Sequence, residues 1–287
     1  MSMRILVLGA SGMLGSAVFN VLSCNTTDRV YGSVRTSDGM RLFVPDLADR
    51  LVHVQDLEDH DQLAQLLNVI TPDVVVNCMA LGKQDTANPM RSMSMFAILP
   101  QRLARLCRLT GARLIQISSD GVFSGGRGNY SEDDFPDALD VYGTAKFLGE
   151  VKEPHAITLR TSIIGPEIQS KNGLLEWFLA QHTDCRAFTR AIFSGFPTNV
   201  LAEIIRDVVI PRPQLSGIYH VATPPISKFD LLRLIAQRYG KDIELIPDDK
   251  LVMNRSLNAT LFFRATGYVP PAWPELIDSM HSYHSNF

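Results

Sequence analysis

The first strand-like segment of the chain runs directly into a glycine-rich turn, and this pairing constrains the fold most. Residues Arg4 to Leu8 are apolar, and a helix-like run over Ser16 to Leu22 follows the turn. Between them, Gly9 permits a tight turn, Gly12 lets the backbone approach a pyrophosphate, and Gly15 lets the helix pack close to the strand. The helix N-terminus adds free N–H groups and a partial positive charge. The alternative is a strand-to-helix turn without a ligand. The context favours a dinucleotide-binding loop made of Gly9, Ser11, Gly12, Met13, Leu14 and Gly15.

Strand and helix signals alternate through the first half of the chain. The expected helices include 63–70, 99–110 and 141–151, each with apolar residues at helical spacing. Near-continuous apolar strands that alternate with helices are typical of a parallel sheet covered on both faces. We therefore expect an α/β fold, with a Rossmann-type doubly wound parallel sheet. Its expected strands are 4–8, 29–35, 51–54, 74–79, 113–118 and 155–160.

The pattern becomes irregular and richer in proline after Gly165-Pro166. We interpret residues 1–165 as the dinucleotide-binding domain and 166–287 as a smaller, mixed C-terminal substrate lobe. The two are expected to be interleaved, because a strand near 218–222 returns to the main sheet.

Composition narrows the partners and the compartment. A net charge of -3 gives no sign of a nucleic-acid partner. Four dispersed cysteines without a CxxC pair indicate no metal site and reduced thiols. No apolar stretch has the length of a membrane span, and a first strand that begins by Arg4 leaves no space for a secretory signal before it. We therefore expect a cytoplasmic protein without membrane contact.

Two further motifs carry the candidate chemistry. Tyr142 and Lys146 lie four residues apart on a predicted helix, so their side chains share a face. An ammonium group beside a phenol lowers the phenol pKa, and such a tyrosine can protonate a developing alkoxide. Ser118, Ser119 and Asp120 end a predicted strand, where a hydroxyl can hydrogen-bond a substrate carbonyl. The alternatives are a surface Tyr–Lys pair and ordinary turn residues.

The order of these motifs resembles that of the extended short-chain dehydrogenase/reductases. Residues 117–150, ISSDGVFSGGRGNYSEDDFPDALDVYGTAKFLGE, are similar to the dTDP-4-dehydrorhamnose reductase branch, which has a hydroxyl-Asp-x-Val-Phe run, an acidic-Pro loop and VYGxxKxxGE. Further matches include 72–80, 159–166, 195–198 and 217–222, and those beyond the first two thirds of the chain are weaker.

The resemblance implies specific roles. Ser119 is the hydroxyl member, because it stands three residues before Val122; Tyr142 is the general acid; and Lys146 holds the nicotinamide ribose. Asp56 and Leu57 lie near the adenine, and Ala80 lies beside the ribose and pyrophosphate path. The resemblance also implies a nucleotide-linked 4-keto (deoxy)sugar as substrate and is compatible with a homodimer. Arg186, Arg190 and Arg255 are our candidates for contacts with the substrate phosphates.

Two positions depart from the family pattern. Phe96 stands where the family often has Asn, and Gly121 stands where the branch has an aromatic residue. Neither departure removes the hydroxyl, the tyrosine or the lysine. Two other functions stay open: an epimerase or dehydratase that retains its cofactor, with Asp120 as an extra acid or base, and a non-catalytic NADP-binding subunit like the regulatory subunit of methionine adenosyltransferase.

The segment after the second predicted strand bears on the choice of cofactor. Chains that prefer NAD usually end this strand with an acidic residue that binds the ribose 2′-hydroxyl. Ser33-Val34-Arg35-Thr36 has no acid, and the guanidinium of Arg35 can pair with a 2′-phosphate. NADP(H) is therefore favoured and NAD(H) is the alternative, in which Arg35 simply faces solvent.

This assignment predicts a selective effect of Arg35→Ala. The variant should bind NADPH more weakly and NADH almost as before, because only NADPH carries the 2′-phosphate. Titration of the protein with each cofactor measures the two affinities. Equal losses for both cofactors would contradict the role of Arg35.

Overall fold

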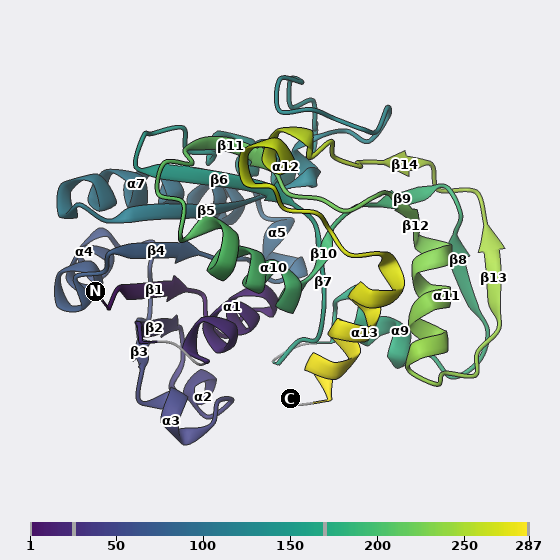
Figure 1. The fold of residues 1–287 in the computed structure, drawn as a ribbon, viewed down its shortest axis with the longest axis horizontal. Coiled ribbons are helices and arrows are strands. Elements are labelled where there is room, and N and C mark those ends of the chain that lie inside the picture. Colours follow the sequence, from purple (N-terminus) through teal and green to yellow (C-terminus); the bar gives the residue numbers. More distant parts are fainter. Residues whose placement is uncertain (1, 25–26, 169–170, 286–287) are drawn as a thin grey trace.

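Seven parallel strands form the main sheet in a computed structural model that describes residues 2–24, 27–168 and 171–285 (Figure 1). The strands lie in the order β11-β6-β5-β4-β1-β2-β3, and every neighbouring pair is parallel. Their bounds are Arg4–Leu8 (β1), Arg29–Val34 (β2), Leu51–His53 (β3), Val74–Asn77 (β4), Arg113–Ser119 (β5), Ala156–Thr161 (β6) and Gly217–His220 (β11). The expected doubly wound α/β fold is confirmed.

The side chains of β1 show why both faces of this sheet are covered. Ile5 and Val7 belong to one buried apolar cluster, whereas Leu6 and Leu8 belong to another on the opposite face. Because successive side chains of a strand point to opposite faces, an apolar strand of this kind needs helices on both sides. The first cluster includes side chains from α1, α10 and α13, and the second includes side chains from α4, α7 and α8.

The longer helices are α1 (Met13–Ser23), α4 (His60–Ile70), α7 (Leu99–Thr110), α8 (Val141–Leu148), α10 (Thr198–Ile204), α11 (Lys228–Arg238), α12 (Thr260–Thr266) and α13 (Trp273–His284). Shorter α-helices are α2 (Ser37–Met40), α3 (Pro45–Ala48), α5 (Lys83–Thr86), α6 (Pro89–Ser92) and α9 (Leu174–Leu179). Three segments have other helical geometries: the π-helices η1 (Met93–Ile98) and η3 (Ile205–Val209), and the 3₁₀-helix η2 (Asp120–Val122).

The strand order reverses direction between β1 and β4, at the carboxyl ends of these strands. From β1 the chain proceeds outward to β2 and β3, and it then returns to the other side of β1 to form β4, β5 and β6. Connections that leave a sheet in opposite directions open a crevice between them, and doubly wound proteins bind ligands there. The glycine turn after β1 lies at this point.

Most of the remaining strands form a smaller lobe that lies beside the main sheet (Figure 1). Its own apolar core includes side chains of α9, α11 and β8. Helix α13 joins the two parts, since Leu276 packs in the core of the main sheet while Ile277 and Met280 pack in the core of the lobe. The division of the chain at residue 165 stays a prediction. The small strands are β7 (Ile163–Ile164), β8 (Cys185–Phe188), β9 (Ala191–Phe193), β10 (Phe196–Pro197), β12 (Ile226–Ser227), β13 (Leu245–Asp248) and β14 (Met253–Asn254).

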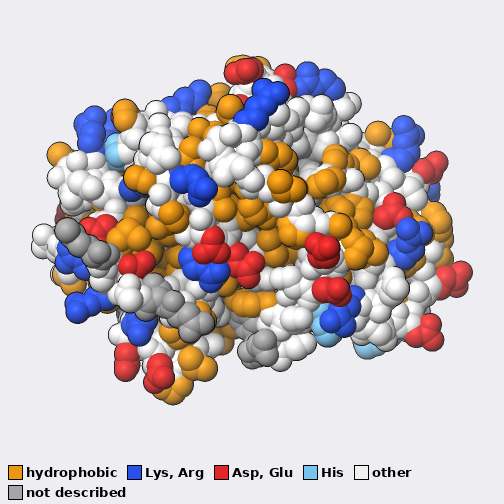
Figure 2. Space-filling view, viewed as in Figure 1, with side chains coloured by type: hydrophobic (Ala, Val, Ile, Leu, Met, Phe, Trp, Pro, Cys, Tyr) orange, Lys and Arg blue, Asp and Glu red, His pale blue; other side chains and the backbone are white. Residues whose placement is uncertain are grey.

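Charge on the surface is mixed in sign. Figure 2 shows acidic and basic side chains interspersed on the face that it displays. Within the described residues, no helix combines the length and apolarity that are needed to cross a bilayer. The same residues contain no group of three or more His, Cys, Asp or Glu side chains placed to hold a metal ion.

The packing of α1 on β1 depends on the absence of a side chain at Gly15. A Cβ atom at this position would overlap the carbonyl oxygen of Gly9, so the helix would have to move. We expect Gly15→Ala to lower the free energy of unfolding by about 1–3 kcal/mol, the usual cost of overpacking. Denaturant unfolding measures this, with Gly82→Ala as the control, because among the described residues no atom outside the adjacent residues lies within 4 Å of a Cβ at Gly82. Equal stabilities of the two variants would contradict the close-packing role.

Candidate active site

The glycine turn is fixed against the end of β2 and leaves the start of α1 open. The N–H of Gly9 donates to Ser33 Oγ at 3.1 Å, and the N–H of Ala10 donates to the Ser33 carbonyl at 2.9 Å. Gly9 has φ +76°, which a residue with a side chain rarely adopts. Helix α1 begins at Met13, and no described side chain caps its first turn. The N–H groups of that turn are therefore available to an anion, as a pyrophosphate site requires.

The other predicted cofactor residues follow the carboxyl ends of neighbouring strands. Arg35 lies directly after β2 and is exposed; Asp56 and Leu57 lie just beyond β3; and Ala80 lies after β4 and is exposed. Leu57 is buried in the apolar core, so its side chain supports the loop, whereas Asp56 is exposed and accepts a hydrogen bond from the N–H of Glu58. Because the strands are parallel, these residues all lie along one edge of the sheet. Their contacts with a cofactor stay predictions.

The structure brings Ser119 and Tyr142 together. Ser119 is the last residue of β5, and Tyr142 lies in the first turn of α8, which Asp140 caps by accepting a hydrogen bond from the N–H of Gly143 at 2.8 Å. The Ser119 and Tyr142 side chains lie close enough for the Ser119 hydroxyl to lower the pKa of the phenol. Gly121 makes this approach possible, since a Cβ there would lie 2.9 Å from Tyr142 Cε1 and 3.1 Å from Ser119 Oγ. The side chain missing at this departure from the family pattern therefore leaves space for the tyrosine ring.

The structure also separates the roles of the two adjacent serines. Ser118 Oγ is buried and donates to Glu150 Oε1 at 2.9 Å, so it belongs to the interior. Ser119 Oγ accepts from the N–H of Gly121 at 2.9 Å and donates to Asp120 Oδ1 at 3.2 Å. Only Ser119 is partly exposed at the strand end, which supports its choice as the candidate substrate contact.

Lys146 lies one turn after Tyr142 and is buried, with 8% of its surface exposed. Its Nζ donates to the Ile117 carbonyl at 3.3 Å and lies 4.6 Å from the centre of the Phe96 ring. Burial lowers the pKa of Lys146 to about 8, because the ammonium group loses its hydration. The amine therefore remains largely protonated at neutral pH.

The pKa of Tyr142 differs from the expectation that Lys146 lowers it. Burial raises this pKa, whereas the hydrogen bond with Ser119 and the charge of Arg255 act in the opposite direction. Lys146 is not among the groups that shift this pKa. Its ammonium group instead contacts the Ile117 carbonyl and the Phe96 ring. In this structure the phenol is therefore protonated at neutral pH, the state that a proton donor requires.

Asp120 adds a carboxyl group beside these side chains. Burial raises its pKa to about 6, while the charge of Arg255 and hydrogen bonds with Ser119 and Ser162 lower it. Arg255 comes from the segment after β14 and also lies 3.6 Å from a carboxylate oxygen of Asp140. Of the three arginines proposed to bind phosphate, Arg255 lies beside Asp120 and Asp140. The charged group of Arg186 lies 3.8 Å from Asp248 in the smaller lobe, and the Arg190 carbonyl accepts a hydrogen bond from the N–H of Met253.

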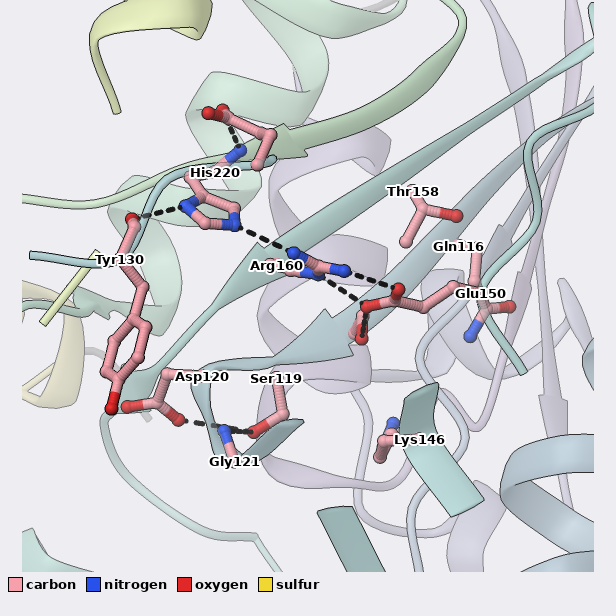
Figure 3. A network of polar contacts seen from close by, with 12 residues as sticks. Gln116, Ser119, Asp120, Gly121, Tyr130, Lys146, Glu150, Thr158, Arg160 and His220 are labelled. Atoms are coloured by element: carbon pink, nitrogen blue, oxygen red, sulfur yellow. Dashed lines mark hydrogen bonds and ion pairs between the residues drawn. The ribbon is translucent and has the colours of Figure 1, made fainter. Parts of the chain in front are cut away.

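Behind the site, a buried chain of polar contacts crosses the sheet (Figure 3). Arg160 Nε and Nη2 donate to the two carboxylate oxygens of Glu150 at 2.7 and 2.8 Å. Arg160 Nη1 contacts His220 Nε2 at 3.1 Å, and His220 Nδ1 contacts the Tyr130 carbonyl at 3.0 Å. Because arginine can only donate, His220 Nε2 accepts and Nδ1 carries the proton. Burial, followed by the charge of Arg160, lowers the pKa of His220 to about 3, so this histidine is neutral.

This network was not predicted as a unit from the sequence. Glu150 lies in the quoted VYGxxKxxGE motif, but Arg160 and His220 lie on β6 and β11, and only the sheet brings them to Glu150. The sequence did contain one signal for this network. Arg160 lies in a largely apolar strand, and a charged side chain that is buried in such a strand requires a partner of opposite charge.

The parallel sheet, the glycine turn and the Ser–Tyr–Lys arrangement define a protein of the extended short-chain dehydrogenase/reductase type. The chain belongs to the RmlD substrate binding domain family, whose model matches residues 3–265. It is 27% identical over 318 residues to mouse methionine adenosyltransferase 2 subunit beta, which covers 96% of this chain and 89% of the relative. It is 31% identical over 254 residues to the probable low-salt glycan biosynthesis reductase Agl14 of Haloferax volcanii, covering 84% and 81%.

A solved structure confirms the fold. A dTDP-4-dehydrorhamnose reductase from Bacillus anthracis, solved in complex with NADP, superposes with a TM-score of 0.82 at 23% identity. The match covers 99% of each chain, so the main sheet and the smaller lobe are both shared.

The buried ion pair gives a prediction for stability. Glu150→Gln should lower the free energy of unfolding by about 3 kcal/mol or more, because it leaves the buried guanidinium of Arg160 without its counter-charge. Chemical unfolding measures the loss. Asp38→Asn is the control, because it breaks the Asp38–Arg41 pair, whose side chains are 82% and 83% exposed, and it should change stability little. A loss no greater than that of the control would show that the buried pair does not stabilise the fold.

Proposed function

We propose that this protein is an NADP(H)-dependent reductase of a nucleotide-linked 4-keto (deoxy)sugar. The observation that carries the proposal is the contact between Ser119 and Tyr142, with Lys146 one turn further along the same helix. These groups lie at the carboxyl end of β5, on the same sheet edge as the glycine turn. The family and the reductases among the relatives support this reaction class.

The residues that would hold the dinucleotide fit its chemistry. The uncapped N-terminus of α1 suits the pyrophosphate, and the exposed Arg35 suits a 2′-phosphate. Lys146 can donate to the ribose hydroxyls adjacent to the nicotinamide. When bound, the reduced dinucleotide supplies a hydride to the keto carbon.

The protein's own groups handle the proton and the developing charge. Ser119 donates a hydrogen bond to the carbonyl oxygen and holds it beside the phenol. Tyr142 O–H then gives its proton to that oxygen as the negative charge develops. Lys146, one turn further along α8, would hold the nicotinamide ribose beside this pair, so that the reacting groups stay in place as the charge develops.

Arg255 is our candidate for recognition of the substrate. Its Nε is buried without a hydrogen-bond partner among the described residues, and its guanidinium lies near Asp120 and Asp140. A buried, unpaired donor is costly, and a bound phosphate or sugar oxygen can satisfy it. We therefore propose that the nucleotide sugar binds between the main sheet and the segment that follows β14. The expected homodimer stays a prediction.

Two other functions have specific support. Asp120, with its pKa near 6, is suited to acid–base chemistry, as a dehydratase or an epimerase requires. The similarity to methionine adenosyltransferase 2 subunit beta instead favours a non-catalytic binding subunit. A reductase consumes one NADPH for each product, an epimerase or dehydratase shows no net consumption, and a binding subunit shows no turnover.

Tyr142→Phe tests the reductase directly. Removal of the phenolic hydroxyl should lower kcat about a hundred- to ten-thousand-fold, the usual contribution of a positioned acid, and leave NADPH affinity nearly unchanged. NADPH absorbance is followed with a panel of nucleotide-linked 4-keto sugars. Tyr219→Phe is the matched control, since Tyr219 packs against Phe262 in the core. Full activity of Tyr142→Phe would rule out its role as the proton donor.

A further inference from the structure

Phe96 contacts both side chains that the proposed reaction requires. Its ring lies beneath the ammonium group of Lys146, with Nζ 4.6 Å from the ring centre. The ring of Tyr142 packs on it at right angles, with the centres 5.3 Å apart and an interplanar angle of 88°. Phe96 is only 3% exposed, so these contacts form in an environment from which water is largely excluded. A cation over an aromatic face is stabilised most in such surroundings.

The backbone around Phe96 is shaped to bring the ring there. Phe96 lies in the π-helix η1, between α6 and α7, and Pro100 follows four residues later. Proline has no N–H, so the Phe96 carbonyl cannot form its ordinary α-helical hydrogen bond. Gly149, just after α8, lets η1 approach closely, since a Cβ there would overlap the Phe96 carbonyl oxygen. The π-helix η1 and its close contact with Gly149 therefore place the Phe96 ring against α8.

The other groups that face Lys146 do not supply a full counter-charge. Glu150 is engaged by both Arg160 and Ser118 and contributes only a more distant attraction. Burial raises the pKa of the Cys78 thiol to about 12, so it is neutral. Tyr142, on the same helix, has a raised pKa and is neutral as well. In the described part of the chain, Lys146 thus forms no ion pair, and the Phe96 face and the Ile117 carbonyl are its near partners.

We propose that Phe96 is a positioning residue that holds Lys146 in its protonated form through the ring face and fixes Tyr142 against the same ring. The proposal rests on the proposed reductase function for its kinetic consequence, but the contact between ring and ammonium group can be tested without turnover. The ammonium form is lost as pH rises through the pKa of Lys146. A weaker ring–cation contact lowers that pKa and moves the loss of activity to lower pH.

The sharpest test replaces Phe96 with a series of mono-, di- and trifluorophenylalanines, which weaken the negative ring face stepwise with little change of shape. The ¹³Cε signal of Lys146, assigned by its loss in Lys146→Arg, gives the pKa by NMR titration. We expect the pKa to fall with each added fluorine, and by about one unit in Phe96→Leu. The alkaline limb of kcat should move by the same amount.

Phe262 provides the matched control. It is fully buried in the core on the other face of the sheet and touches neither Tyr142 nor Lys146, so its fluorination and Phe262→Leu should leave the Lys146 pKa unchanged. A Lys146 pKa that is constant across the Phe96 series would overturn the proposal, even in an active enzyme. A graded pKa in a protein that reduces no keto sugar would support the contact with the ring and contradict the reductase function instead.

Discussion

The buried ion pair between Glu150 and Arg160 is the interaction on which the site depends. Glu150 follows α8, the helix that carries Tyr142 and Lys146, and Arg160 lies on β6 in the main sheet. The same carboxylate accepts a hydrogen bond from Ser118, the residue before Ser119. One charged group thus fixes the helix with the phenol and amine to the strand with the hydroxyl. A displacement of about 1 Å between such groups can cost much of the rate, which explains why two charges are buried here.

The network continues from this pair to the segment that borders the site. The His220 ring connects Arg160 to the Tyr130 carbonyl, and the backbone N–H of His220 donates to Glu132 Oε1 at 2.8 Å. Because His220 is neutral, it acts as a hydrogen-bond link whose state does not change near neutral pH. Tyr130 in turn pairs with the segment around Leu257, close in sequence to Arg255. Hydrogen bonds therefore connect the main sheet to the loop beyond β5, and this loop in turn pairs with the segment that carries Arg255.

Local patterns were sufficient to predict the sheet, the position of Ser119 at a strand end, and the position of Tyr142 and Lys146 on one helix. The apolar strand 4–8 and the glycines after it form one continuous segment, and Tyr142 and Lys146 are separated by one helical turn. Both of these patterns involve residues that are close together in the sequence. The contacts of Arg160 with Glu150 and His220 join positions far apart in sequence, and only the completed sheet defines them. The pKa of Tyr142 depends similarly on burial, which a motif does not report.

The geometry of η1 shows how a local irregularity can serve the site. A proline inside a helix removes a hydrogen bond, and a tight helix contact restricts a position to glycine, so both are unfavourable when considered alone. Pro100 and Gly149 act on the same carbonyl group. Pro100 cannot donate the usual helical hydrogen bond to the Phe96 carbonyl, and the missing side chain of Gly149 lets that carbonyl lie against the end of α8. Residues that are locally unfavourable but support each other are expected at functional sites, where the position of the reacting groups matters more than the stability of one helix. Under our proposal, an aromatic residue at position 96 has a physical reason: its ring face can hold the ammonium group of Lys146, which forms no ion pair among the described residues.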